Sequence, residues 1–234
     1  MVSFPFIAGF IAAGTHVLSG PDHLAAVTPL VTDNPEKSWR IGLFWGIGHI
    51  LGMILIGVLF LLFKAYIPLD FISGISERLV GIILIALGFW TFYRIFRQAK
   101  RHAHPHMHRT EQKVYVHIHR HEHTVDSTHA HSHFSFIFQT LWSALGIGII
   151  HGFAGISHFI LLFPVLGFNH ISQSIFYMGG FALGTVTTMI FYAFLVGKLS
   201  VIGSTGEGKM LGILRWSSGL FALLIGIYWI LKSL

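Results

Sequence analysis

The chain has 234 residues, of which 53% are hydrophobic and only 10% charged, with a mean hydropathy of +0.70. Soluble domains average about 25% charged residues, so this composition excludes an ordinary soluble enzyme. There are no cysteines, which excludes disulfides, thiolate zinc sites and thiol redox chemistry. The excess of 15 Lys and Arg over 9 Asp and Glu fits basic loops beside a membrane better than a nucleic-acid partner.

Six apolar runs approach or exceed the roughly 20 residues that cross a bilayer. We expect an all-α polytopic membrane protein with spans near 4–30, 39–63, 79–96, 134–166, 173–196 and 210–231. The first and fourth helices are expected to be broken. Residues 1–97 and 134–234 are predicted to form two three-helix repeats, joined by a histidine-rich loop at 98–133.

The first span carries His16, Asp22 and His23 around the dipeptide Gly20-Pro21. An ionisable side chain at this depth is costly, about 2.5 kcal/mol or more for a charged Asp. Proline interrupts helical hydrogen bonding, and secondary transporters place ion sites at such breaks in the membrane. Asp22 is the one carboxylate inside this predicted span. These residues therefore predict an ion site at a helix break.

The second half repeats this pattern. A shift of 135 positions places His16 on His151 and His23 on His158, and Gly20 and Pro29 also find matches. Two copies of three spans insert in opposite orientations, which is an inverted repeat with its site at the repeat interface. His49 of the second span is a further candidate, either as a gate or as a packing residue.

Neutral imidazoles favour Ni²⁺, Co²⁺, Cu²⁺ and Zn²⁺, whereas Mg²⁺ and Ca²⁺ prefer oxygen ligands. Seven residues on a straight helix rise about 10.5 Å, too far for His16 and His23 to share one ion. Either the helix unwinds at Gly20-Pro21, or partners come from the other repeat. The expected metal ligands are His16, Asp22, His23, His49, His151 and His158.

Twelve of the 15 Lys and Arg residues fall in the loops after the first, third and fifth spans, or at the adjoining helix ends. The positive-inside rule places these loops in the cytosol and both termini outside, in the inner or plasma membrane. Residues 102–133 contain 11 histidines in alternating clusters. We expect a largely disordered cytosolic loop that binds or buffers metal, with a short hairpin as the less favoured alternative.

The segment His16–Ala26 resembles the signature of nickel/cobalt transporters, in particular their short UreH-like branch. Residues 151–155 and 181–185 resemble two further motifs of that branch more weakly. This resemblance implies metal binding by His16, Asp22 and His23. The classical permeases have four residues between the first His and the Asp, where this chain has five.

Residues 203–210 nearly match a phosphate-binding loop but end in Met210 instead of a hydroxyl residue, so no ATP is expected. We predict a non-enzymatic secondary transporter of a divalent metal, Ni²⁺ or Co²⁺ first and Zn²⁺ next, that needs no cofactor. Its partners are the ion and the lipid bilayer, with a cytosolic metallochaperone as a further candidate. An intramembrane metalloenzyme and a metal-sensing membrane protein are the alternatives.

Overall fold

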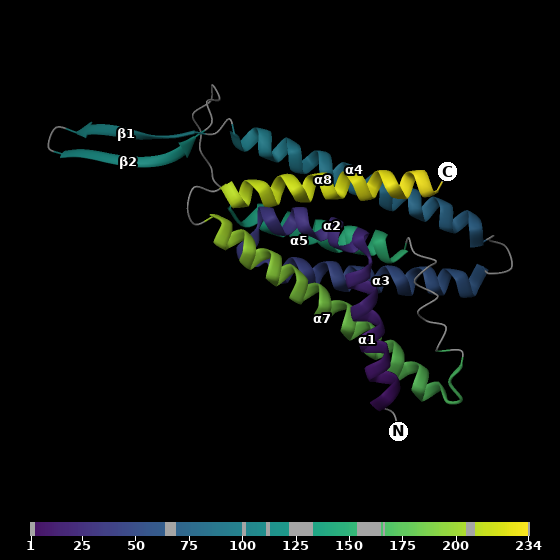
Figure 1. The fold of residues 1–234 in the computed structure, drawn as a ribbon. Coiled ribbons are helices and arrows are strands. Elements are labelled where there is room, and N and C mark those ends of the chain that lie inside the picture. The colour runs from purple at the N-terminus through teal and green to yellow at the C-terminus, as the bar shows by residue number, and fades with distance from the viewer. Residues whose placement is uncertain are drawn as a thin grey trace.

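The structure is a computed structural model of the chain, and it describes residues 3–63, 69–99, 102–110, 113–121, 133–153, 165, 167–204 and 209–233. Long helices dominate it (Figure 1). The elements are α1 (Ser3–Ser19), α2 (Pro21–Asp33), the 3-10 helix η1 (Pro35–Lys37), α3 (Ser38–Phe63), α4 (Leu69–Ala99), β1 (His102–Thr110), β2 (Lys113–His121), α5 (His133–Phe153), α7 (Ile171–Ser204) and α8 (Lys209–Lys232).

Within these ranges, four helices are long and apolar enough to cross a membrane, and the bent pair α1–α2 makes a fifth. The expectation of a helical, multi-pass membrane protein is confirmed. The predicted fourth span is described only through α5, whose apolar part Thr140–Phe153 is short. The remainder of that span, including His158, lies outside the described residues, so the break expected there stays a prediction.

The predicted break in the first span is present. Helices α1 and α2 meet at Gly20 with a bend of 72°. Gly20 has extended backbone angles, φ −86° and ψ 97°, and Pro21 opens α2 at the position where its missing N–H costs nothing. The two halves then pack against different neighbours, α1 against α7 and α2 chiefly against α8. Gly20-Pro21 thus divides one hydrophobic run into two separately anchored helices.

Three helix pairs carry most of the packing, namely α3 with α5, α1 with α7, and α4 with α8. Helices α3 and α5 approach each other closely enough for their backbones to touch. A Cβ on Gly48 would collide with the carbonyl oxygen of Leu145, and one on Gly152 with that of His49. Small residues that allow backbones to touch are the usual means of association between helices in membranes. This contact fixes α3 against α5 at the level of His49.

The histidine-dense segment is not a disordered loop where it is described. β1 and β2 form a two-stranded antiparallel sheet that extends past the end of the bundle at which α4 ends (Figure 1). The alternation of Val114, Val116 and Ile118 with polar residues suits a strand. The sheet corrects the expectations of disorder and of a purely helical chain.

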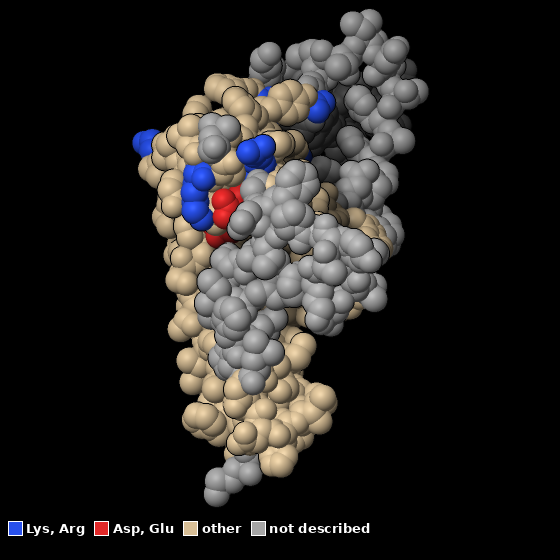
Figure 2. All heavy atoms as spheres, turned by 90° about the vertical axis from the view of Figure 1, so that its right-hand side faces the viewer, with Lys and Arg blue, Asp and Glu red and all other residues tan. Residues whose placement is uncertain are grey.

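Charged side chains are few on the end of the molecule opposite the sheet. Figure 2 shows basic and acidic side chains gathered on one part of that face, while the rest of the described surface in this view is uncharged. Lys232 of α8 lies 3.4 Å from Glu77 of α4, and Arg78 donates a hydrogen bond to the carbonyl of Ser233 at 2.9 Å. These contacts join α4 to α8 at this end.

Candidate metal centre

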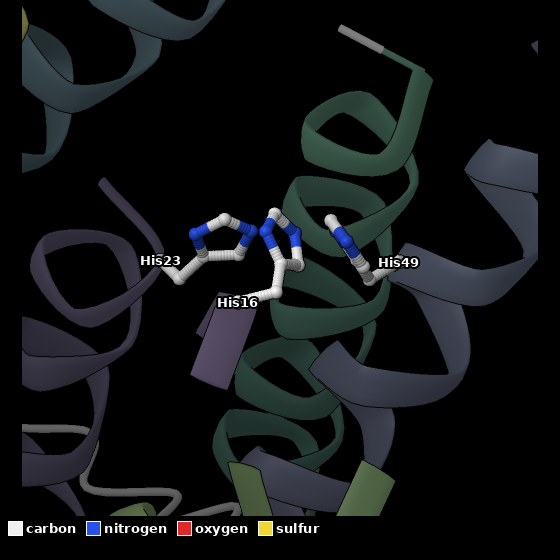
Figure 3. A group of neighbouring side chains, drawn as sticks. All are labelled: His16, His23 and His49. Atoms are coloured by element: carbon white, nitrogen blue, oxygen red, sulfur yellow. The ribbon is translucent and has the colours of Figure 1, made fainter. Parts of the chain in front are cut away.

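The bend between α1 and α2 places histidines from three helices beside one another. His16 is three residues before the end of α1, His23 is in the first turn of α2, and His49 is on α3. One ring nitrogen from each lies within 4.8 Å of the other two. Their rings point toward one another (Figure 3). In a straight helix, His16 and His23 would lie about 10.5 Å apart along the axis. The 72° bend between α1 and α2 brings them together.

The three rings form a compact group. Ring centroids are 4.7 Å apart for His16 and His23, 5.0 Å for His23 and His49, and 6.1 Å for His16 and His49. His23 and His49 are buried, and His16 is half-buried. Two nitrogens on one tetrahedral ion at 2.0–2.1 Å lie about 3.4 Å apart. To coordinate one ion together, each ring therefore has to move by about 1 Å or less.

Asp22 lies next to this group. Its Oδ1 is 3.1 Å from Nδ1 of His23, and the residue is 8% exposed. A carboxylate on one imidazole nitrogen fixes the ring orientation and makes the other nitrogen a better ligand. Asp22 therefore lies where it can orient the His23 ring, and its expected role as a metal ligand stays a prediction. Its negative charge still offsets part of the charge of a divalent ion.

Two further buried rings complete the surroundings. His151 of α5 is 1% exposed, with its ring centroid 6.0 Å from that of His23. Trp45 of α3 stacks on His49 with centroids 4.9 Å apart and planes 10° apart, and it approaches His23 at 5.5 Å. Our reading of the sequence missed Trp45. The signal was its position one helical turn before His49 on the same face.

Five of the six expected ligands therefore fall in one region, contributed by α1, α2, α3 and α5. His16, His23 and His49 are close enough to share an ion, whereas Asp22 and His151 border them. His158 lies outside the described residues. An imidazole group of this kind, enclosed by apolar helices, can hold a late first-row divalent ion.

The comparisons with known proteins agree with a membrane protein. Residues 6–228 match the protein family described as the cytochrome c biogenesis protein transmembrane region. The chain belongs to this family. Membership in the cytochrome c biogenesis transmembrane family and the apolar helices together establish an integral multi-pass membrane protein.

Named relatives of this family member include the urease accessory protein UreH of Bacillus sp. (strain TB-90). The two are 30% identical over 192 residues, 81% of this chain and 74% of UreH. The chloroplast proteins FOR GROWTH AND FERTILITY 1 and 2 of Arabidopsis thaliana are 41% and 42% identical over 81 residues. That match spans 34% of this chain but only 22% of either plant protein. No solved structure matches the chain.

These relatives confirm the expected kinship with UreH-like proteins at the level of homology. The family description refers to cytochrome c biogenesis, but this chain has no cysteine. Any chemistry that it performs on a ligand therefore uses no thiol of its own.

Proposed function

We propose that the chain is a secondary transporter that carries a divalent transition metal ion, Ni²⁺ or Co²⁺ in the first place, across the membrane. The observation that carries this proposal is the convergence of His16, His23 and His49 at the break between α1 and α2. Broken helices with polar groups inside the bilayer are the usual ion sites of such transporters.

The chemistry of the donors supports the choice of metal. Three imidazoles and one nearby carboxylate suit Ni²⁺, Co²⁺ and Zn²⁺, and the absence of thiolates disfavours Cu⁺. The resemblance of His16–Ala26 to nickel/cobalt transporters and the kinship with a urease accessory protein both favour nickel. Three neutral donors also leave coordination positions for water, so the ion can exchange.

The helix pairs support an inverted repeat. If α1–α2, α3 and α4 correspond to the predicted fourth span, α7 and α8, a twofold axis exchanges the pair α1–α7 with the pair α5–α3. The same axis maps α4–α8 onto itself. The observed pairings are those that this symmetry requires. We accordingly propose two oppositely inserted three-helix halves, both termini outside, and the hairpin in the cytosol.

We extend the proposal to the hairpin as a metal-binding element. Its register pairs three histidines of β1 with three of β2, namely His102 with His121, His104 with His119 and His106 with His117. Directly opposed residues of an antiparallel pair belong to one face, with Cβ atoms roughly 4.5–5.5 Å apart. Register and spacing together favour ion binding between strands, which would buffer metal at the cytosolic end of the path.

A flux measurement tests both the proposed transport and the proposed role of the hairpin. We expect the full chain in proteoliposomes to move Ni²⁺ to an enclosed fluorescent indicator at a saturable rate, well above that of empty liposomes. A variant with the seven strand histidines changed to Gln should keep this rate while binding fewer ions at equilibrium. Metal binding without flux would contradict transport and support a sensor or an enzyme.

Gly20 offers a test of the geometry of the break. A Cβ at this position would collide with Nδ1 of His23 and lie 3.1 Å from Oδ1 of Asp22. We expect Gly20→Ala to displace the His23 ring and weaken Ni²⁺ binding by about 10–100-fold, the usual scale for disturbing an orienting contact. Gly57→Ala is the control, because a Cβ on Gly57 meets open space. Equal affinities of both variants, measured by calorimetry, would contradict this geometry.

A further inference from the structure

The end of α2 farthest from the metal centre carries a second buried carboxylate. The Asp33 side chain is 3% exposed and is the last residue of α2. Nε of Arg94 on α4 lies 3.5 Å from its Oδ2, and Nε of Arg215 on α8 lies 3.7 Å from its Oδ1. Arg215 also donates to the carbonyl oxygen of Thr32 at 3.4 Å. These contacts tie α2 to α4 and α8. Asp33 lies beyond the end of the predicted first span, 4–30, and was not among the expected site residues.

Helix α2 lies between the metal centre and this charged group. His23 is in its first turn and Asp33 is at its end, roughly 15 Å further along the axis. Nine of its 13 residues are buried, because α3, α4, α5, α7 and α8 all contact it. The charged group lies at the end of the bundle from which the hairpin extends (Figure 1). An ion that travelled along α2 from the centre toward the hairpin would therefore meet the closely packed end of this helix.

The charges suit a contact that opens and closes. Buried ion pairs contribute little net stability, because desolvation offsets much of their attraction, but removing one partner is strongly unfavourable. Here one carboxylate lies between two guanidinium groups that are 22% and 19% exposed. Losing the carboxylate would leave two like charges facing each other. The packing of the end of α2 against α4 and α8 thus depends on Asp33 more than on either arginine.

We infer that Asp33, Arg94 and Arg215 form a gate that closes the path between the metal centre and the hairpin side of the membrane. The gate opens when the end of α2 separates from α4 and α8, with the break at Gly20 as the hinge. This inference rests on the proposed transport function for its purpose. Its geometry and its test are independent of metal.

The natural absence of cysteine makes the gate directly measurable. Thr32 is fully buried beside Asp33, and Thr32→Cys puts one thiol in place of its hydroxyl and methyl groups, with a similar overall side-chain volume. The rate of maleimide labelling of this thiol, in the detergent-solubilised full chain without metal, then reports how often α2 leaves its closed position. We expect Asp33→Asn in this background to speed labelling by roughly tenfold or more.

Two controls separate the gate from a general loss of structure. Asp33→Glu keeps the charge and should label at nearly the parent rate. Glu77→Gln removes an ion pair between α4 and α8 at the other end and should also leave the rate unchanged. If Asp33→Asn loses its helical circular dichroism, Arg94→Gln decides the matter, with an expected smaller but clear acceleration.

Labelling rates within about twofold of the parent for both Asp33→Asn and Arg94→Gln would overturn the gate. That result would leave transport standing, because the assay contains no metal. Conversely, absent Ni²⁺ flux with accelerated labelling would refute transport and leave a hinged, charge-held α2 in place.

Discussion

Changing His23 to Ala is expected to abolish metal transport, with Ni²⁺ flux falling to the level of empty liposomes. His23 is at the centre of the site, because its ring approaches those of His16, His49, His151 and Trp45. Removing it takes away one of three close donors and the partner of Asp22. We expect affinity to fall by about 100-fold or more, beyond the range typical of orienting contacts. Isothermal titration and flux in proteoliposomes measure the two effects.

Two further variants serve as comparisons for His23→Ala. His170→Ala removes an exposed histidine away from the site and should leave both measurements unchanged. Asp22→Asn should weaken binding by about 10–100-fold, less than His23→Ala, because Asp22 lies against the His23 ring, where it is placed to orient that proposed ligand. Retained flux in His23→Ala would show that the histidines only fill space. A larger loss in Asp22→Asn would make Asp22 the ligand that the sequence first suggested.

Changing Gly152 to Leu is expected to have the largest effect on folding. A Cβ on Gly152 would collide with the backbone carbonyl of His49, and no rotamer change can relieve contact with backbone. Helices α3 and α5 would have to separate and carry His49 and His151 with them. We expect a loss of about 3 kcal/mol or more in stability, in the upper range of overpacking effects, together with the loss of metal binding.

The control for this variant is on the same helix. A Cβ on Gly146 meets open space, so Gly146→Leu should fold with the melting temperature of the parent. Thermal unfolding of the purified protein in detergent, followed by circular dichroism, compares the two. A stable Gly152→Leu variant that still binds Ni²⁺ would mean that α3 and α5 do not pack through Gly152.

Local chemistry made the break and the first ligands predictable from sequence. Gly20-Pro21 signals an interruption wherever it occurs in an apolar run, and histidines beside such an interruption indicate an ion site. The direction of the 72° bend was not predictable, since it depends on α1 packing on α7 and α2 on α8. The direction of the bend is what brings the rings of His16, His23 and His49 close together.

The features that the sequence did not reveal depend on contacts between distant segments. In the sequence, Trp45 is an ordinary aromatic residue of an apolar helix. Its place beside the site depends on α5, which brings the ring centroid of His151 to 5.7 Å from that of Trp45. Asp33 looks like a loop residue until Arg94 and Arg215 surround it. The sequence favoured a disordered loop over a hairpin, because a strand needs a partner strand. The alternation of histidines alone does not identify that partner. The correspondence between His23 and His158 is still a prediction.

If the proposed site binds a hydrated ion, the unequal exposure of the three histidines has a consequence for how that ion is captured. His16 keeps part of its surface accessible, whereas His23 and His49 are enclosed. An arriving ion can exchange one water for the outer imidazole before it sheds the others to reach the inner pair. Dehydration would then proceed in small steps instead of one. For ions that release water as reluctantly as Ni²⁺, such a graded sequence would set the speed of loading.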